Sequence, residues 1–126
     1  MADTFDRFFV APSNFDRTLD FYTKVLGCEI TSKWGSAEEG RGATLQIGGM
    51  KAAIADEHRD DTQDNARKAI NGTRLTIYIA VDSLQARFNA ITDKHCIVIE
   101  PERTHWGIHW CVVRDPDGNL IAYTQK

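Results

Sequence analysis

Residues 13–27 read SNFDRTLDFYTKVLG, and residues 82–91 repeat the same pattern in a shorter form, DSLQARFNAI. Both stretches begin with side chains that cap helices, and apolar residues then recur at helical spacing. These residues are Phe15, Leu19, Tyr22 and Leu26 in the first stretch and Leu84, Phe88 and Ile91 in the second. Each stretch is therefore predicted to form an amphipathic helix, opened by Ser13 in one case and by Asp82 in the other.

The two predicted helices belong to an internal repeat, because a constant offset of 69 residues relates them. The same offset relates apolar residues before and after the helices, and a glycine in a predicted turn. The pairs are Phe8 and Ile77, Val10 and Ile79, Ile30 and Ile99, and Gly49 and Gly118. The chain is thus predicted to contain two units with the order β-α-β-β-β.

Alternating side chains predict the strands of each unit. In residues 74–81 the odd positions are all apolar, whereas the even positions include Arg74, Thr76 and Tyr78. One face of this strand should contact a helix, and a ligand could lie on the other. By the same phase, Arg7 and Phe9 should face away from the first helix. Further strands are expected near residues 29–33, 43–47, 51–55, 96–99, 108–114 and 120–124.

These elements predict an α+β fold in which two β-α-β-β-β modules form curled mixed sheets around a cleft. A single domain should span residues 1–126, with modules at about 5–55 and 73–125. The charged segment 56–72 is expected to be a linker, with a possible helical turn at 66–70. Closing the cleft requires either the other half of the chain or a second chain, so we expect a homodimer.

Composition restricts the class of protein. The chain has 126 residues, 42% of them hydrophobic and 26% charged, with a formal net charge of -3, which is typical of one globular domain and disfavours nucleic acid as a partner. No apolar run has the length of a membrane helix, and the N-terminus lacks the apolar region of a signal peptide. Three cysteines without C-x-x-C spacing disfavour disulfides and thiolate metal sites. We therefore expect a cytoplasmic protein with no membrane or nucleic-acid partner.

Three segments together resemble the vicinal oxygen chelate superfamily, and in particular its bleomycin-resistance-like branch. They are FDRTLDFYTKVLG at 15–27, the pair Trp106-Gly107, and VRDPDGNLI at 113–121. The resemblance covers nearly the whole chain, from about Phe5 to Thr124. It implies the glyoxalase/bleomycin-resistance fold, and it is similar in motif order and spacing to the paired modules of that superfamily.

The resemblance also locates the positions at which metal enzymes of the superfamily, such as glyoxalase I, hold a divalent ion. Carried over to this sequence, those positions are Arg7, Thr76, Ala122 and approximately Ala53. None of these side chains is an ordinary ligand for a divalent ion. His105 and His109 do not replace them, because residues four apart on a strand are separated by roughly 13 Å. The chain is therefore expected to bind neither a metal nor another cofactor.

The predicted cleft combines aromatic side chains with few polar groups, which suits an aromatic or anionic small molecule. Its expected lining is Arg7, Phe9, Gln46, Thr76, Tyr78, Ile108, Trp110, Val112 and Ala122. Arg7 would bind an anionic group, although an internal acid could hold it while the aromatic rings merely fill a core. Trp34 and Trp106 could flank the groove or serve as packing anchors. Cys111 is expected to be buried on the helix side.

These observations favour a small-molecule binding protein that sequesters an aromatic or anionic ligand without a metal. Whether the chain is an enzyme stays open. One alternative is a lyase, isomerase or dioxygenase with a shifted metal site, or with Tyr78 and His109 as acid and base. Another is a sensor or interaction module in which the cleft has lost its ligand.

Overall fold

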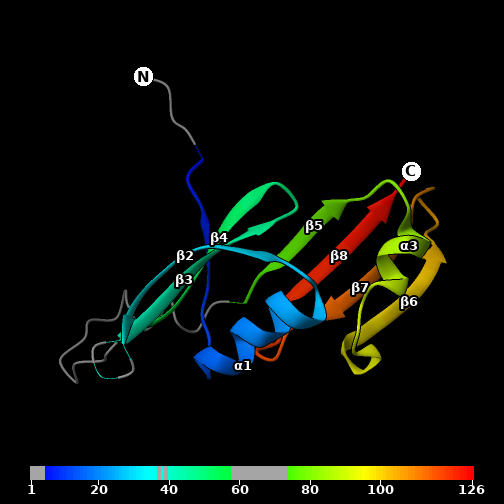
Figure 1. Cartoon of the computed structure of the whole chain (residues 1–126). Helices are drawn as coiled ribbons and strands as arrows, with labels where there is room; N and C mark the ends of the chain where they lie inside the picture. Colours follow the sequence, from blue (N-terminus) through cyan, green and yellow to red (C-terminus); the bar gives the residue numbers. More distant parts are fainter. Residues whose placement is uncertain (1–4, 37, 39, 58–73) are drawn as a thin grey trace.

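The computed structural model describes residues 5–36, 38, 40–57 and 74–126. It contains two four-stranded mixed sheets, one from each half of the chain, which are not closed into a barrel. In Figure 1 the sheets lie side by side, with α1 along their seam and α3 against the second sheet. The α+β fold expected from the repeat is confirmed.

Sheet A has the strand order β1-β4-β3-β2, and sheet B has the order β5-β8-β7-β6. In each sheet the first strand is parallel to the last, and the other pairs are antiparallel. The strands of sheet A are β1 (Phe8–Val10), β2 (Glu29–Ser36), β3 (Gly40–Ile47) and β4 (Met50–Glu57). Those of sheet B are β5 (Thr76–Ala80), β6 (Ile97–Arg103), β7 (His109–Arg114) and β8 (Leu120–Gln125).

The helical segments are short. They are α1 (Phe15–Asp20), which continues as the π-helical η1 (Phe21–Val25), then α3 (Leu84–Asn89) and the 3-10 segment η2 (Lys94–Cys96). None of the helices in the described part of the chain is long and apolar enough to cross a membrane.

The helix caps lie one residue later than the sequence pattern indicated. The Asn14 side chain accepts a hydrogen bond from the Arg17 amide at 3.0 Å, and Ser83 accepts one from the Ala86 amide at 3.1 Å. The assignment of Ser13 and Asp82 as caps was therefore wrong, because a capping side chain binds the amide three residues ahead and only the later residues reach it. The offset between the halves is preserved, since Asn14 and Ser83 are equivalent positions.

The strands run further than expected at several ends, and β4 continues to Glu57, inside the segment expected to be a linker. The rest of that segment, including the helical turn expected at 66–70, lies outside the described residues. The predicted phase of β5 agrees with its burial: Ile77 and Ile79 are buried, whereas Thr76, Tyr78 and Ala80 are exposed. The core therefore lies on the helix side of both sheets.

The residues that carry the family resemblance contact one another across the two halves of the chain. Tyr22 of η1 donates its hydroxyl hydrogen to Asp115 at 2.7 Å, and the Asn119 side-chain amide donates to the same carboxylate at 2.8 Å. Thr18 of α1 donates to Asp117 at 2.7 Å. Burial, followed by the charge of Asp115, raises the pKa of Tyr22, so its phenol stays protonated. This buried network fastens the first helix to the β7–β8 turn.

Candidate binding site

Each sheet has one face turned away from the helices, which we call its open face. Strand register places the open face of sheet B by alternating side chains. One cross-strand row contains Tyr78, Ala122 and Val112, and the neighbouring row contains Ala80, Thr124 and Trp110. On this face, Tyr78 and Trp110 stack with 6.5 Å between ring centroids, and Trp106 meets Trp110 edge-to-face at 5.5 Å. We call these three residues the aromatic ladder.

The aromatic ladder is accessible. Tyr78 is 60% exposed and Trp106 54%, so no described element covers this part of sheet B. Trp110 is half-buried, and its indole nitrogen donates a hydrogen bond to Glu102 at 3.0 Å. Rings of this size seldom lie open in a compact domain without a ligand or a partner.

The loop that carries Trp106 is fixed by its own backbone. The Thr104 amide and hydroxyl both donate to the Ile108 carbonyl, at 2.8 and 2.9 Å, and the Gly107 amide donates to the Thr104 carbonyl at 3.1 Å. Gly107 has a φ of 93°, which glycine adopts without strain. From the sequence, Trp106 could either flank a groove or serve as a packing anchor. The structure places it in the aromatic ladder.

The open face of sheet A carries Arg7, Phe9 and Trp34. Arg7 forms an ion pair with Asp6 at 3.2 Å and a long hydrogen bond with Thr44 at 3.5 Å. The Arg7 side chain is 43% exposed and that of Asp6 77%, so its acid is a surface neighbour, not an internal one. Water screens such a pair strongly, and an anionic ligand could displace Asp6 at little cost.

Trp34 lies flat against the backbone of the neighbouring strand. The register opposes Trp34 to Gly42, and a Cβ atom at Gly42 would lie only 2.1 Å from the indole ring. Glycine is therefore required beneath this ring. Trp34 remains 45% exposed and offers a second flat aromatic surface.

The structure divides the predicted lining between the two sheets. Sheet A carries Arg7, Phe9 and Gln46, whereas sheet B carries Thr76, Tyr78, Ile108, Trp110, Val112 and Ala122 or their connecting loop. Val112 and Ala122 are only 4% and 1% exposed, so they form the base beneath the aromatic ladder. Gln46 lines a separate cavity of about 410 Å³.

The four positions that hold metal in related enzymes also divide between the sheets. The open face of sheet A carries Arg7 and Ala53, and that of sheet B carries Thr76 and Ala122. A guanidinium, a hydroxyl and two methyl groups do not make a divalent-metal site. Among the described residues, no three His, Cys, Asp or Glu side chains are grouped as metal ligands would be.

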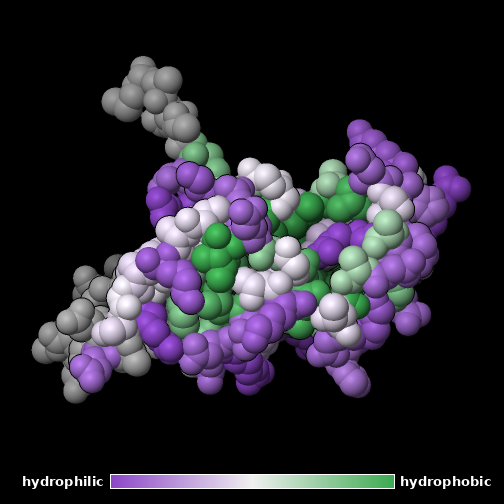
Figure 2. Space-filling model, viewed as in Figure 1, coloured by the Kyte–Doolittle hydropathy of each residue, from purple (hydrophilic) through white to green (hydrophobic). Residues whose placement is uncertain are grey.

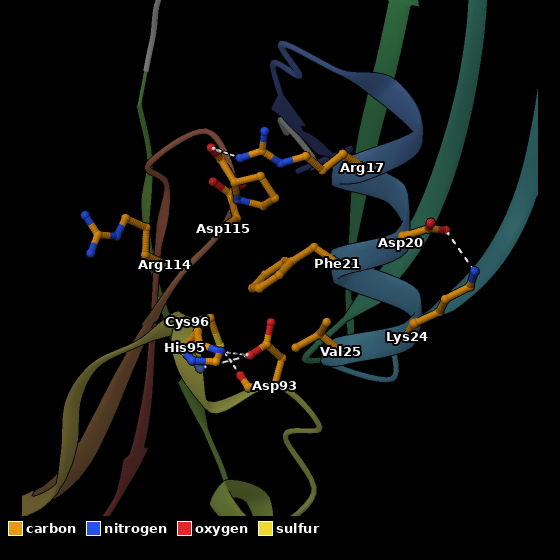
Figure 3. A pocket seen from close by; sticks show the side chains of 11 residues that line it. Arg17, Asp20, Phe21, Lys24, Val25, Asp93, His95, Cys96, Arg114 and Asp115 are labelled. Carbon is orange, nitrogen blue, oxygen red and sulfur yellow. Dashed lines mark hydrogen bonds and ion pairs between the residues drawn. The ribbon is translucent and has the colours of Figure 1, made fainter.

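A larger cavity of about 780 Å³, not expected from the sequence, lies on the helix side between η1, η2 and the β7–β8 turn. Figure 3 shows Phe21 pointing into it from above Asp93 and Val25. Its charges are largely balanced locally, because Lys24 pairs with Asp20 at 3.4 Å. The His95 Nδ1 atom lies 3.0 Å from a carboxylate oxygen of Asp93, within hydrogen-bond distance. The hydrogen bond from the His95 amide is the main cause that lowers the pKa of Asp93.

Two further residues of this cavity are unsuited to binding or catalysis there. Arg114 belongs by register to the open face of sheet B, and Figure 3 shows its side chain turned away from Phe21. Burial raises the pKa of the Cys96 thiol, which keeps it protonated and a poor nucleophile. We therefore interpret this cavity as a gap in the seam between the two halves.

Comparison with known proteins identifies the class. The chain belongs to the Glyoxalase/Bleomycin resistance protein/Dioxygenase superfamily, because the sequence profile of that family matches residues 4–123. No curated protein sequence matches it significantly. The predicted resemblance is confirmed.

Solved structures share the fold at low sequence identity. TioX from Micromonospora sp. ML1 is 22% identical with a TM-score of 0.73, over 98% of this chain and 96% of that one. TnmS3, described as an antibiotic binding protein from Streptomyces sp. CB03234, is 21% identical with a TM-score of 0.69, over 99% and 98%. A glyoxalase/bleomycin resistance protein from the same Streptomyces strain is 20% identical with a TM-score of 0.65, over 97% and 100%.

Proposed function

We propose that this protein binds a small planar aromatic molecule on the aromatic ladder and sequesters it without a metal. The observation that carries the proposal is the exposed arrangement of Tyr78, Trp110 and Trp106, held in place by Glu102 and by the Thr104–Ile108 loop. Offset and edge-to-face aromatic contacts contribute about 0.5–1.5 kcal/mol each beyond simple burial. Membership of the superfamily and the antibiotic-binding role given for TnmS3 support a ligand-binding role.

We further infer that the chain forms one domain of two modules and acts in the cytoplasm as a homodimer. A second copy whose sheet A covers the aromatic ladder would bring Trp34 and Arg7 to the opposite side of a flat ligand. Arg7 would then bind an anionic substituent of that ligand. The exposure of both open faces in a single chain supports this arrangement.

One feature argues against acid-base catalysis by Tyr78 and His109. His109 precedes Trp110 on β7, so the two side chains point to opposite faces of sheet B. His109 also lines a shallow pocket with Leu84 of α3, on the helix side. Tyr78 and His109 therefore cannot act on one substrate, which favours binding over catalysis.

The test is a titration with naphthalene-2-carboxylate and with the uncharged naphthalene-2-carboxamide, followed by calorimetry and thermal unfolding. We expect both to raise the melting temperature, and Tyr78→Ala or Trp106→Ala to weaken binding about tenfold, equivalent to about 1.4 kcal/mol. The control is Val98→Ala, an exposed apolar residue of β6 outside the aromatic ladder.

Arg7→Gln tests separately whether Arg7 binds an anionic group. This substitution should weaken the binding of naphthalene-2-carboxylate and leave the binding of naphthalene-2-carboxamide unchanged. If Tyr78→Ala and Trp106→Ala bind each compound with the same affinity as the parent protein, the aromatic ladder is not the binding site. The number of ligand molecules bound per chain, measured by calorimetry, would show whether two chains share one ligand or each chain binds its own.

A further inference from the structure

The cavity that contains Gln46 lies where the two halves of the chain meet. Its walls come from the segment after η1, the ends of β3 and β5, and from α3 and β8. Leu26, Ile47 and Ile79 supply apolar surface, and Gln46, Glu29 and Arg87 supply polar groups. Figure 2 shows apolar surface in the middle of this side of the molecule, between the two sheets, with hydrophilic residues around the rim.

Arg87 is the distinctive residue of this cavity. Its Nη2 donates hydrogen bonds to the Leu26 carbonyl and, at 3.0 Å, to the Tyr123 hydroxyl. The guanidinium carbon lies 4.7 Å above the centre of the Tyr123 ring. These contacts hold the half-buried guanidinium in one orientation across the boundary between the two halves.

No carboxylate of the described chain neutralises Arg87, since its contacts there are to a carbonyl, a hydroxyl and a ring. Within the described part of the chain, these contacts leave the Nε and Nη1 donors of Arg87 without a hydrogen-bond partner. Charged groups removed from water are normally paired, because desolvation without a counter-charge is costly. A fixed guanidinium beside an apolar cavity is complementary to a carboxylate with a small apolar body.

We propose that this cavity is a second ligand site, which binds a small aliphatic monocarboxylate. The carboxylate accepts a hydrogen bond from one of the two remaining donors of Arg87, Nε or Nη1. The Gln46 side-chain amide is a second donor, and the alkyl group lies against Leu26 and Ile79. The site is distinct from the aromatic ladder, because Arg87 belongs to α3, on the helix side of sheet B.

Two neighbouring residues shape the selectivity of this site. Glu29 lines the same cavity, and its carboxylate repels a second negative charge, so a monoanion is favoured over a dianion such as phosphate. Cys28 is also in the lining, and burial raises the pKa of its thiol to about 11. The thiol is therefore neutral near pH 7 and does not compete with the ligand for Arg87.

The experiment is a titration of the full chain with isobutyrate and, separately, with inorganic phosphate, followed through backbone amide shifts in nuclear magnetic resonance spectra. We expect isobutyrate to move the amides of residues 27–29 and 46–48, and phosphate to bind at least tenfold more weakly. Glu29→Gln should increase the affinity for isobutyrate about threefold, and Gln46→Ala should decrease this affinity about fivefold.

Arg87→Lys tests the guanidinium directly, but Arg87 also holds the Leu26 carbonyl and its replacement can affect folding. Glu29→Gln and Gln46→Ala avoid that difficulty. Glu100→Gln, which removes one exposed negative charge on β6, should leave the affinity unchanged and is the matched control. The proposal is wrong if Glu100→Gln tightens binding as much as Glu29→Gln, or if Gln46→Ala has no effect.

Tyr78→Ala separates this site from the aromatic ladder. Undiminished isobutyrate binding by that variant supports two independent sites, even if naphthalene-2-carboxylate fails to bind. Loss of isobutyrate binding in Tyr78→Ala would instead place the anion on the open face and overturn the proposal.

Discussion

The two sides of the β-sheets differ in what their polar and aromatic groups do. On the helix side, Asp115 and Asp117 are 3% and 9% exposed and accept hydrogen bonds from both halves of the chain. On the open side, Tyr78 and Trp106 are more than half exposed and touch mainly other rings. The helix motif at 15–27 and the turn motif at 113–121 thus maintain the fold. Of the residues suited to ligand binding, Trp106 belongs to a family motif, whereas Tyr78 and Trp110 lie outside these motifs.

The largest effect on stability is expected for Asp115→Asn. The Asp115 carboxylate accepts hydrogen bonds from the Tyr22 hydroxyl, the Asn119 amides and the Asp117 amide, all at 2.7–2.9 Å. An asparagine side chain at this position would replace one acceptor oxygen with an NH₂ donor, which would then face other hydrogen-bond donors. We expect a loss of about 3 kcal/mol in the free energy of unfolding, measured by urea denaturation.

Asp20→Asn is the control for this prediction, because Asp20 is exposed and, among the residues that the structure describes, its ion pair is with Lys24. It should change the free energy of unfolding by less than about 0.5 kcal/mol. Equal effects of the two substitutions would mean that the buried network does not hold the two halves together.

An intermediate effect is expected from acid. Burial acts to raise the pKa of Asp117, but hydrogen bonds from Ser13 and Thr18 outweigh it, so the pKa lies below its ordinary value. A carboxyl group with a lowered pKa in the folded state stabilises the fold above its unfolded pKa of about 3.9, and this stabilisation disappears as the pH falls further. Asp117→Asn should therefore lose about 1–2 kcal/mol at pH 7 and show a smaller further loss below pH 4.

Urea unfolding of the parent and of Asp117→Asn between pH 3 and pH 7 checks this slope. The matched control is Glu100→Gln, since Glu100 is exposed and outside the network. Parallel stability curves for the parent and Asp117→Asn would contradict the role assigned to Asp117.

Much of the helix side could be predicted from the sequence, because burial there imposes a period on the side chains. Ile77 and Ile79 are buried as their alternation indicated. The role of Asp115 was not predicted, since its partner Tyr22 is 93 residues away and local patterns carry no information about such contacts. The caps were misplaced by one residue because Ser, Asn and Asp are all good capping residues, and only the backbone geometry selects among them.

The candidate site was less predictable. The alternation of side chains along each strand correctly predicted that Tyr78 and Arg7 lie on the open faces. This alternation shows which face of its own strand a residue occupies, but not how one sheet is positioned relative to the other. The predicted lining therefore combined residues that lie on separate sheets of one chain. Trp106 lies in the site because of the conformation of its loop. In the sequence, the neighbouring Gly107, which adopts a positive φ, was the local feature that could indicate this conformation.

The smallest effect on stability is expected for the aromatic ladder itself, which sharpens the contrast with Asp115. Tyr78→Ala and Trp106→Ala remove rings that are more than half exposed, so each should cost less than about 1 kcal/mol in the unfolding of the isolated chain. Urea unfolding at several protein concentrations checks this value. If a second copy covers the aromatic ladder, the parent gains stability with concentration and both variants lose that dependence. A loss above about 2 kcal/mol that is independent of concentration would instead show that these rings belong to the core, and that the open face is not a binding surface.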